Sequence, residues 1–495
     1  MIDKRQIGRN AIVAVLQIVV NGVILFFLYR FFIKTIGAEQ FGIWALVMAF
    51  TSFASATNLG FADTTVKFVA ANMANNDHER TDLVIQTSVI SMAVISGLVM
   101  LAIFPLVLWI IQYFVSGNAL SFARLLLPYS FFSFWLMLVA GVFLSGLDGF
   151  KRTDIRGLLL ITSNLTNLIL CVLLVPKYGL LGIALSALIS NACALVSSWL
   201  AIKKIEPSLP IFPYVWQRDL CRSLIAYALK FQVTSIAIIF FLPLTKALLG
   251  KYGSLSMLTY FEMSNRMILQ FRSLLVSAYQ VLVPVISEYK ETKPELMSLV
   301  YGKAYELIFF LSIPVFAILI ISVPLLSLIW IGYVENTFVL ISKVLAFAWL
   351  ISTLATPAYV FSLGAGSLKW NISGHIIIAL LTGLGGYVLG CFFGGNGVLV
   401  STFIAISFGN LVISVPVHLN NGLRIRDYVP KGSLHILIIV AACLVITQAP
   451  ILGYCKLCPP FLIHMISISS CAVIIVVAAL HPMCRRLFAW IKTCL

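Results

Sequence analysis

Long apolar runs follow one another along almost the whole chain. Runs of about 20 residues recur between charged or Gly/Pro-rich breaks, and a helix needs that length to cross the hydrocarbon core of a bilayer. Residues of the types AVILMFWYC make up 61% of the 495 residues, whereas Asp, Glu, Lys and Arg make up only 10%. A soluble globule of this composition would lack the polar surface that faces water. The chain is therefore predicted to be an all-α integral membrane protein.

The apolar runs predict about 14 transmembrane helices. They cover residues 11–34, 41–62, 83–114, 121–147, 156–175, 179–202, 223–249, 255–287, 302–332, 337–363, 371–392, 396–418, 433–450 and 460–482. No hydrophilic stretch between them exceeds about 25 residues, which leaves no room for a soluble catalytic domain. We therefore expect the function to lie inside the helical bundle, and we expect a non-enzymatic protein.

The charge balance predicts the orientation in the membrane. The chain has 33 Lys and Arg against 17 Asp and Glu, a formal net charge of +16. Loops rich in Lys and Arg are retained in the cytoplasm, and an N-terminus on that side places most basic flanks there, among them Arg9, Lys151, Lys203 and Arg424. An even number of spans then returns the C-terminus to the same side. The first run is too long for a cleaved signal peptide, so it is predicted to be the first span.

Short matches recur in the same order in two halves of the chain. Residues 37–42 resemble 250–253, residues 105–110 resemble 324–331, and residues 182–186 resemble 397–401. The shifts are all about 211 to 219 residues, which predicts an internal duplication. We predict an N-lobe of six spans (1–205), a C-lobe of six spans (206–420) and an appended pair of helices (421–495), the lobes being related by pseudo-two-fold symmetry. Two such lobes around a cavity are typical of alternating-access transporters; a scaffold for other proteins is the alternative.

Several ionisable residues lie near the ends of predicted spans. Arg30 and Lys34 are one helical turn apart in the first span, and Lys246 occupies nearly the equivalent place in the seventh. These cations either line the outer half of a cavity and bind substrate, or extend to the outer headgroups. Asp63 and Lys67, at the end of the second span, are spaced i, i+4 and are secondary candidates that also fit an ordinary surface pair.

The eighth span carries the deepest charges. Glu262 and Arg266 are spaced i, i+4 and can form an ion pair, Arg272 lies further along, and Asn265 and Gln270 add polarity. Charged groups at the centre of a span cost about 2.5 to 3.5 kcal/mol each, so we expect them to line a cavity, with a structural salt bridge between helices as the alternative. The charged residues within the spans are mainly cationic, with Arg30, Lys34, Lys246, Arg266 and Arg272 against Glu262. This balance predicts an anionic cargo. The planar fork of arginine suits phosphate in particular.

Other motifs are weak. The chain has no GxxxxGK[ST] phosphate loop, so coupling to ATP is not predicted, and neither a metal nor another cofactor is expected. Cys455 and Cys458 form a C-x-x-C pair in a predicted outer loop, and the sequence leaves open whether they form a disulfide.

Five stretches carry a resemblance to a known family. They are Asn10 in the basic N-terminal tail and residues 36–45, 58–61, 145–149 and 176–182. With them the sequence resembles the polysaccharide transporter family, the Wzx-type O-antigen and capsule flippases, of the multidrug/oligosaccharidyl-lipid/polysaccharide exporter (MOP) superfamily. The resemblance covers essentially the whole chain and is carried by loose motifs.

The resemblance implies transport of an undecaprenyl-diphosphate-linked oligosaccharide from the cytoplasmic to the outer leaflet of a bacterial inner membrane. It implies this lipid-linked glycan and the lipid bilayer as partners, with a polysaccharide polymerase and chain-length proteins as further ones, and no nucleic acid. Alternating access would place the diphosphate against Arg266, Arg272, Lys246, Arg30 and Lys34, with Glu262 as the site of H⁺ or Na⁺ coupling. A cation-coupled multidrug antiporter of the same superfamily and a polysaccharide polymerase are the alternatives.

Overall fold

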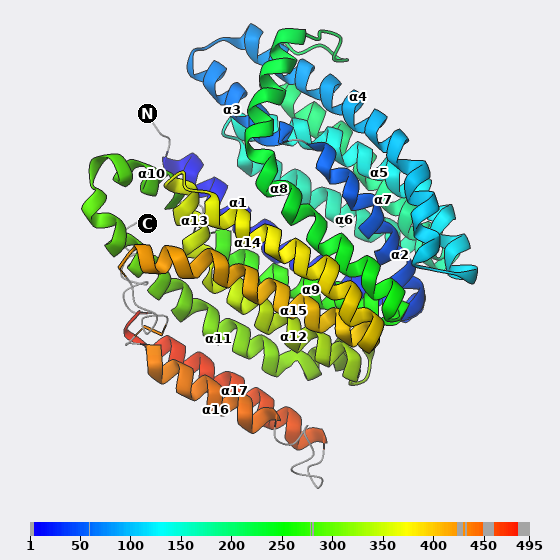
Figure 1. The fold of residues 1–495 in the computed structure, drawn as a ribbon. Coiled ribbons are helices and arrows are strands. Elements are labelled where there is room, and N and C mark those ends of the chain that lie inside the picture. Colours follow the sequence, from blue (N-terminus) through cyan, green and yellow to red (C-terminus); the bar gives the residue numbers. More distant parts are fainter. Residues whose placement is uncertain are drawn as a thin grey trace. The chain divides into compact units, whose positions relative to one another are not determined.

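The computed structural model describes residues 4–58, 60–277, 279, 282–422, 429–430, 433–448 and 460–483. Within these residues the secondary structure is helical and no strand occurs, as Figure 1 shows. Each predicted apolar run falls on helices wherever it is described. Eight elements among the described residues are long and apolar enough to cross a membrane. The prediction of an all-α, multi-pass membrane protein is therefore confirmed.

The predicted break between the runs 371–392 and 396–418 is present, whereas the predicted span 41–62 is interrupted. The element Lys369–Asn420 consists of two helices that meet at Gly394, whose φ of 61° and ψ of −146° are not helical, and the Ser401 hydroxyl of the second helix donates to the Leu381 carbonyl of the first at 2.7 Å. The run 41–62 is broken instead, because α2 (Gly37–Ser52) gives way to a 3₁₀ helix, η1 (Phe53–Asn58). The Ser55 hydroxyl there donates to the Ser52 carbonyl at 2.6 Å, and such local bonds compete with regular helix.

The chain forms two compact units. Unit 1 comprises Met1–Thr259 and Tyr387–Val398, and unit 2 comprises Tyr260–Gly386 and Leu399–Leu495. The lobe boundaries predicted from the internal matches stay a prediction. Besides α2 and η1, unit 1 contains α1 (Lys4–Thr35), α3 (Phe61–Ala74), α4 (His78–Ile110), η2 (Ile111–Tyr113), α5 (Gly117–Gly149), α6 (Thr153–Tyr178), α7 (Leu180–Ile205) and α8 (Arg218–Tyr252).

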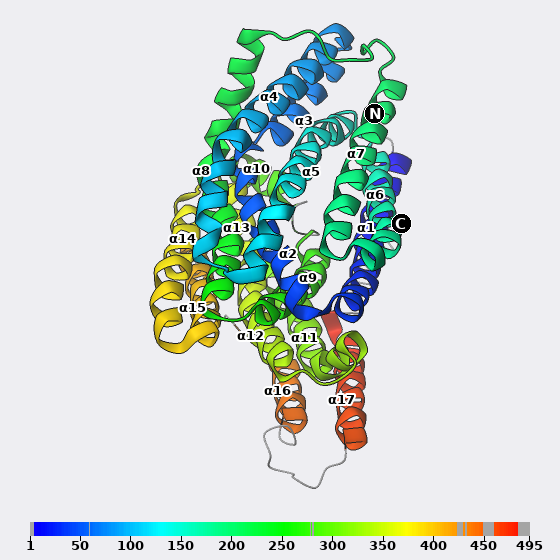
Figure 2. The same cartoon turned by 90° about the vertical axis from the view of Figure 1, so that its right-hand side faces the viewer.

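Helix α5 is the centre of unit 1. It packs against α2, α3, α4, α6 and α7, and most of its apolar length is buried. Figures 1 and 2 both place α5 between α4 and α7. The α6–α7 connection turns tightly at Gly179, whose φ of 56° favours glycine. Just beyond the turn, a Cβ at Gly182 would lie 2.7 Å from the carbonyl carbon of Leu174, so the helix approaches its neighbour at backbone distance.

A buried carboxylate joins α1 to α6 at one end of unit 1. The Asp154 side chain is fully buried and forms ion pairs with Arg9 at 3.0 Å and with Arg152 at 3.1 Å. The amide of Gln6 donates to the same carboxylate at 3.1 Å, and the Asp154 backbone N–H donates to the Asn10 side chain at 3.2 Å. The polar N-terminal tail is therefore part of the packed structure of this unit.

The segment 206–217, between α7 and α8, is bound along the first turns of α4. Glu206 forms an ion pair with His78 at 2.7 Å. The Gln86 side-chain oxygen accepts the backbone N–H groups of Tyr214 and Val215 at 3.2 and 3.3 Å. Further along, the Trp216 indole donates to the Ser91 hydroxyl at 3.0 Å. The connection is thus held by side chains of a neighbouring helix.

Unit 2 is built around α11 (Met297–Ile331). This helix keeps helical geometry through Pro314 and Pro324, as one span, and it packs against α12, α13, α16 and α17. Its aromatic residues, including Tyr301, Tyr305 and Phe309, belong to the buried core of the unit. The other elements of unit 2 are most of α9 (Leu255–Ser277), α10 (Leu282–Thr292), η4 (Pro294–Leu296), α12 (Asn336–Leu354), α13 (Thr356–Gly364), α14 (Lys369–Leu380), η5 (Leu381–Gly385), most of α15 (Gly386–Asn420), α16 (Leu434–Gln448) and α17 (Pro460–Leu480).

Candidate functional site

Helix α9 carries the most polar side chains of any predicted span. Its first turn is capped by Ser254, whose hydroxyl accepts the Met257 backbone N–H at 3.0 Å. Arg266 stands at the midpoint of the helix, about 16 Å from either end at 1.5 Å per residue. A hydrocarbon core is about 30 Å thick, so a helix that crosses it along this length holds Arg266 near its centre.

The predicted ion pair on α9 is present. Arg266 Nε donates to Glu262 Oε1 at 3.0 Å, and the bond lies within the one helix. The two side chains differ in exposure: the Glu262 side chain is 8% exposed and the Arg266 side chain 55% exposed. The buried carboxylate therefore orients an arginine whose side chain is partly exposed. A guanidinium at that depth is stable next to water or an anion and unstable next to hydrocarbon.

Trp349 on α12 contacts two of the polar residues of α9. Its indole Nε1 donates to the side-chain oxygen of Asn265 at 3.0 Å, and its ring lies under the guanidinium of Arg272 with the carbon 5.1 Å from the ring centroid. An arginine over an indole face is a favourable cation–π contact. Arg272 also donates to the Ser352 hydroxyl at 3.4 Å. The cluster formed by Glu262, Asn265, Arg266, Arg272, Trp349 and Ser352 is called the α9–α12 cluster below.

Arg272 retains unused donor capacity. Its Nε is buried, and among the described residues it has no hydrogen-bond partner. On α14 the His375 Nε2 is likewise buried without a partner in the described part of the chain, and the His375 ring packs edge-on against Tyr359 with centroids 5.8 Å apart. A guanidinium with a free donor can bind a phosphate oxygen in the geometry that arginine favours.

Four residues described here were not predicted from the sequence: Ser352 of the cluster, Trp349, His375 and, on the same helix as Trp349, Lys343. Trp349 and His375 look like ordinary residues of apolar runs. Only the packing of α12 and α14 shows that they belong to the surroundings of the charged residues. Lys343 is different: it is a half-buried cation inside the predicted span 337–363. The rule that singles out intramembrane charge would have found it. Gln270, predicted as a secondary candidate, is half-buried on α9, and its backbone carbonyl accepts a hydrogen bond from the Ser273 hydroxyl at 2.8 Å.

The remaining predicted residues belong to unit 1. Arg30 and Lys34 are exposed on α1, whereas Lys246 is buried on α8 with 8% exposure. Lys67 is exposed on α3, a helix that the sequence analysis did not separate from the second span, and Asp63 lies in the same helix with a side chain outside the described residues. Their roles stay predictions. Cys455 and Cys458 lie outside the described residues as well.

Fold and site together define a class. The described part of the chain is an all-helical, multi-pass membrane protein with a charged, partly exposed cluster on helix α9. The family described as "Polysaccharide biosynthesis protein" matches residues 34–334, and the chain belongs to this family. The resemblance stated from the sequence is therefore confirmed. A comparison with curated proteins gives no match.

Solved structures show where the fold occurs. The chain is similar to the lipid II flippase MurJ in an inward closed conformation, with a TM-score of 0.69, 15% identity, and coverage of 95% of this chain and 98% of that one. It is similar to an inward-facing multidrug resistance MATE family transporter, with a TM-score of 0.67, 15% identity and coverage of 80% and 94%. It is also similar to a MOP superfamily transporter from Pyrococcus furiosus, with a TM-score of 0.56, 16% identity, and coverage of 85% of this chain and 94% of that one. The fold is thus that of the MOP superfamily.

Proposed function

We propose that the protein is a flippase that moves an undecaprenyl-diphosphate-linked oligosaccharide, such as an O-antigen, capsule or exopolysaccharide unit, from the cytoplasmic to the outer leaflet by alternating access. The observation that carries this proposal is the α9–α12 cluster, which holds two arginines on one helix, Arg266 at the midpoint of α9 and Arg272 stacked on Trp349. Membership of a polysaccharide biosynthesis family and a fold shared with a lipid II flippase support the choice of a lipid-linked glycan.

The cluster suits a diphosphate. A lipid diphosphate carries about two negative charges and cannot cross hydrocarbon unaided. Arg266 offers an exposed guanidinium fixed by Glu262, and Arg272 offers a guanidinium fixed on Trp349 and Ser352. Both are held in place before the substrate arrives, which lowers the entropy cost of binding. Lys343, and Lys246, Arg30 and Lys34 of unit 1, are further proposed contacts for the headgroup and the sugars.

Glu262 is the proposed coupling site. Its carboxylate is buried and bonded to Arg266, so a proton or Na⁺ that binds Glu262 would compete with that bond and release the guanidinium. Binding of the anionic headgroup to Arg266 and binding of a cation to Glu262 are then linked events, as coupled transport requires. We further propose a bacterial cytoplasmic membrane location with both termini inside, and a polysaccharide polymerase and chain-length proteins as partners.

The test uses a strain from which the gene has been deleted. Arg266→Gln and Arg272→Gln should each abolish surface glycan and cause lipid-linked oligosaccharide to accumulate on the cytoplasmic side, at normal protein level. Lys303→Gln is the matched control, because Lys303 is an exposed cation of unit 2 that pairs with Glu306 at 3.2 Å on α11, a helix that contributes no residue to the cluster. Full glycan display by both arginine variants would overturn the assignment.

A cation-coupled multidrug antiporter is the second candidate, and the fold shared with MATE transporters favours it over a polymerase. An antiporter of cationic drugs would depend on Glu262 and tolerate loss of the arginines. Glu262→Gln that abolishes drug efflux, combined with Arg272→Gln that leaves it intact, would favour this reading. If the protein were a polymerase, the deletion strain would still carry lipid-linked units on the outer leaflet, and they would be polymerised only when the gene is restored.

A further inference from the structure

Three apolar hollows follow one another along one face of unit 1. The first, of about 450 Å³, lies between α4 and α5 and is lined by Gly97, Leu101, Phe104, Phe131 and Trp135 among others. The second, of about 480 Å³, lies between α5 and α7 and shares Phe132 with the first. The third, of about 400 Å³, shares Val196 with the second and reaches the segment 211–213. Neighbouring hollows thus share a lining residue, and the three together are called the furrow below.

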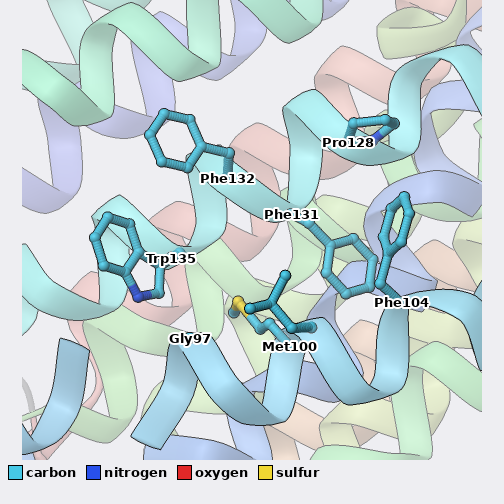
Figure 3. Close-up of a pocket in the computed structure, with 8 residues that line it drawn as sticks. Gly97, Met100, Phe104, Pro128, Phe131, Phe132 and Trp135 are labelled. Carbon is cyan, nitrogen blue, oxygen red and sulfur yellow. The ribbon is translucent and has the colours of Figure 1, made fainter. Parts of the chain in front are cut away.

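Helix α5 is the floor of the furrow, and α4 and α7 are its walls. Figure 3 shows the first hollow, with rings from both helices around it. The rings of Phe104 and Phe131 meet edge-on with centroids 5.4 Å apart, and those of Phe132 and Trp135 stack at 5.8 Å. The Trp135 indole donates to the Ala93 carbonyl at 2.9 Å, so this polar atom is satisfied. The hollow offers a ligand almost only hydrocarbon and aromatic surface.

The furrow is longer than one leaflet is deep. Its lining on α5 runs from Pro128 to Phe143, about 22 Å at 1.5 Å per residue. Half of a hydrocarbon core is about 15 Å. The acyl chain of a phospholipid anchored at one end would therefore leave the far hollow empty. A polyisoprenoid chain is long enough to follow the furrow past the midplane.

A cation stands at one end of this furrow. Arg124 precedes Pro128 by four residues and Phe131 by seven, so on α5 it shares their face. It is exposed, and it donates to the Gln112 side chain of η2 at 3.5 Å. In the predicted orientation this is the outer end of the helices. A phosphate at Arg124 would place the attached hydrocarbon chain at the mouth of the first hollow.

We propose that the furrow binds the polyisoprenoid chain of a lipid phosphate in the outer leaflet, with the phosphate at Arg124 and the distal end of the chain in the third hollow. This site rests on the proposed function, because it assigns a place to the carrier lipid after the glycan has crossed. It is separate from the α9–α12 cluster, which belongs to unit 2.

Photolabelling of the full-length protein in phosphatidylethanolamine/phosphatidylglycerol vesicles tests the proposal. The probe is a polyprenyl phosphate with a diazirine at the distal end of its chain, and the comparison probe is a 16-carbon phosphatidylglycerol with a terminal diazirine. The polyprenyl probe should label peptides of the third hollow, around Phe143 and Trp199, and the phosphatidylglycerol probe should not. Equal labelling of this hollow by both probes, or labelling spread evenly over exposed α4, would overturn the proposal.

Two matched variants on α4 sharpen the result. Leu101 and Leu98 are both exposed, at 73% and 63%, but only Leu101 lines the furrow. Leu101→Trp should lower labelling of the third hollow about tenfold, since excluding two CH₂ groups weakens binding by roughly that factor. Leu98→Trp should leave it unchanged. Arg124→Gln should weaken labelling by the phosphate probe and spare labelling by the corresponding polyprenol.

The two proposals fail in different ways. If labelling of the furrow is absent while Arg266→Gln and Arg272→Gln still abolish glycan display, the furrow site is wrong and the flippase assignment stands. If the arginine variants display glycan fully, the flippase assignment is wrong, and selective labelling of the furrow would then have to be explained by lipid binding alone.

Discussion

Trp349→Phe separates the two contacts that this residue makes. Phenylalanine keeps an aromatic face under Arg272, although a weaker one than indole, and it removes the N–H that Asn265 accepts. Asn265 is only 2% exposed, so its side-chain oxygen would lose this donor in a place that water hardly reaches. The cost of such a loss is about 1 to 3 kcal/mol. We expect the free energy of unfolding to fall by that amount.

Thermal unfolding of the purified protein in detergent gives the measurement. For a unit of this size each kcal/mol shifts Tm by about 2 to 4 °C, so Trp349→Phe should lower Tm by several degrees. Surface glycan should persist in cells, because Arg272 remains stacked. Trp349→Leu removes both contacts and should abolish glycan display as well. Trp109→Phe is the control: Trp109 is 56% exposed on α4, and its substitution should change stability by less than about 0.5 kcal/mol.

A double-mutant cycle decides whether the hydrogen bond is responsible. In the Trp349→Phe background, Asn265→Leu removes the acceptor that has lost its donor, so the second substitution should cost less there than in the native protein. Coupling of about 0.5 to 3 kcal/mol is typical of residues in contact. Additive effects of the two substitutions, or an unchanged Tm for Trp349→Phe, would refute the assignment of Trp349 as the link between Asn265 and Arg272.

Two further predictions concern stability in unit 1. Asp154→Asn should lower the free energy of unfolding by about 1 to 2 kcal/mol, because it removes charge-assisted bonds from a fully buried group whose partners are partly solvated. Limited proteolysis should then cut the N-terminal tail sooner than in Asp219→Asn, a control at an exposed position. Gly182→Ala should lower the free energy of unfolding by about 1 to 3 kcal/mol, and so lower Tm, because the added Cβ meets the Leu174 backbone. Gly141→Ala should be neutral, because a Cβ there has nothing within 4 Å. Equal Tm values for the two variants would contradict the packing.

Hydropathy predicts the helices of this chain well because a membrane span must satisfy its backbone internally, which leaves helix as the only choice for a long apolar run. Helix α3 escaped prediction for a related reason. Its sequence from Phe61 to Ala74 is too polar and too short for a span, and it follows a 3₁₀ helix that hydropathy does not register. The turn at Gly394 falls in the gap between the predicted spans 371–392 and 396–418, so its position was predicted, although the positive φ of this glycine was not.

The candidate site was predictable along one helix and unpredictable across helices. The spacing of Glu262 and Arg266 fixes their contact through helical geometry alone. Arg272 was found because it is charged, but its partners Trp349 and Ser352 are set by how α9 meets α12. Packing between helices in lipid depends on shape rather than on a hydrophobic pattern, so the periodicity of the sequence does not predict which helices contact each other.

The segment 206–217 has a practical consequence. Its composition suggests a free connection between helices, an obvious position for an epitope tag or a fluorescent reporter. Its backbone and side chains are instead bonded to His78, Gln86 and Ser91 at the start of α4. Tolerance to insertion follows from whether the backbone is free, and here it is not. A topology reporter placed in this segment would disturb the protein it is meant to map.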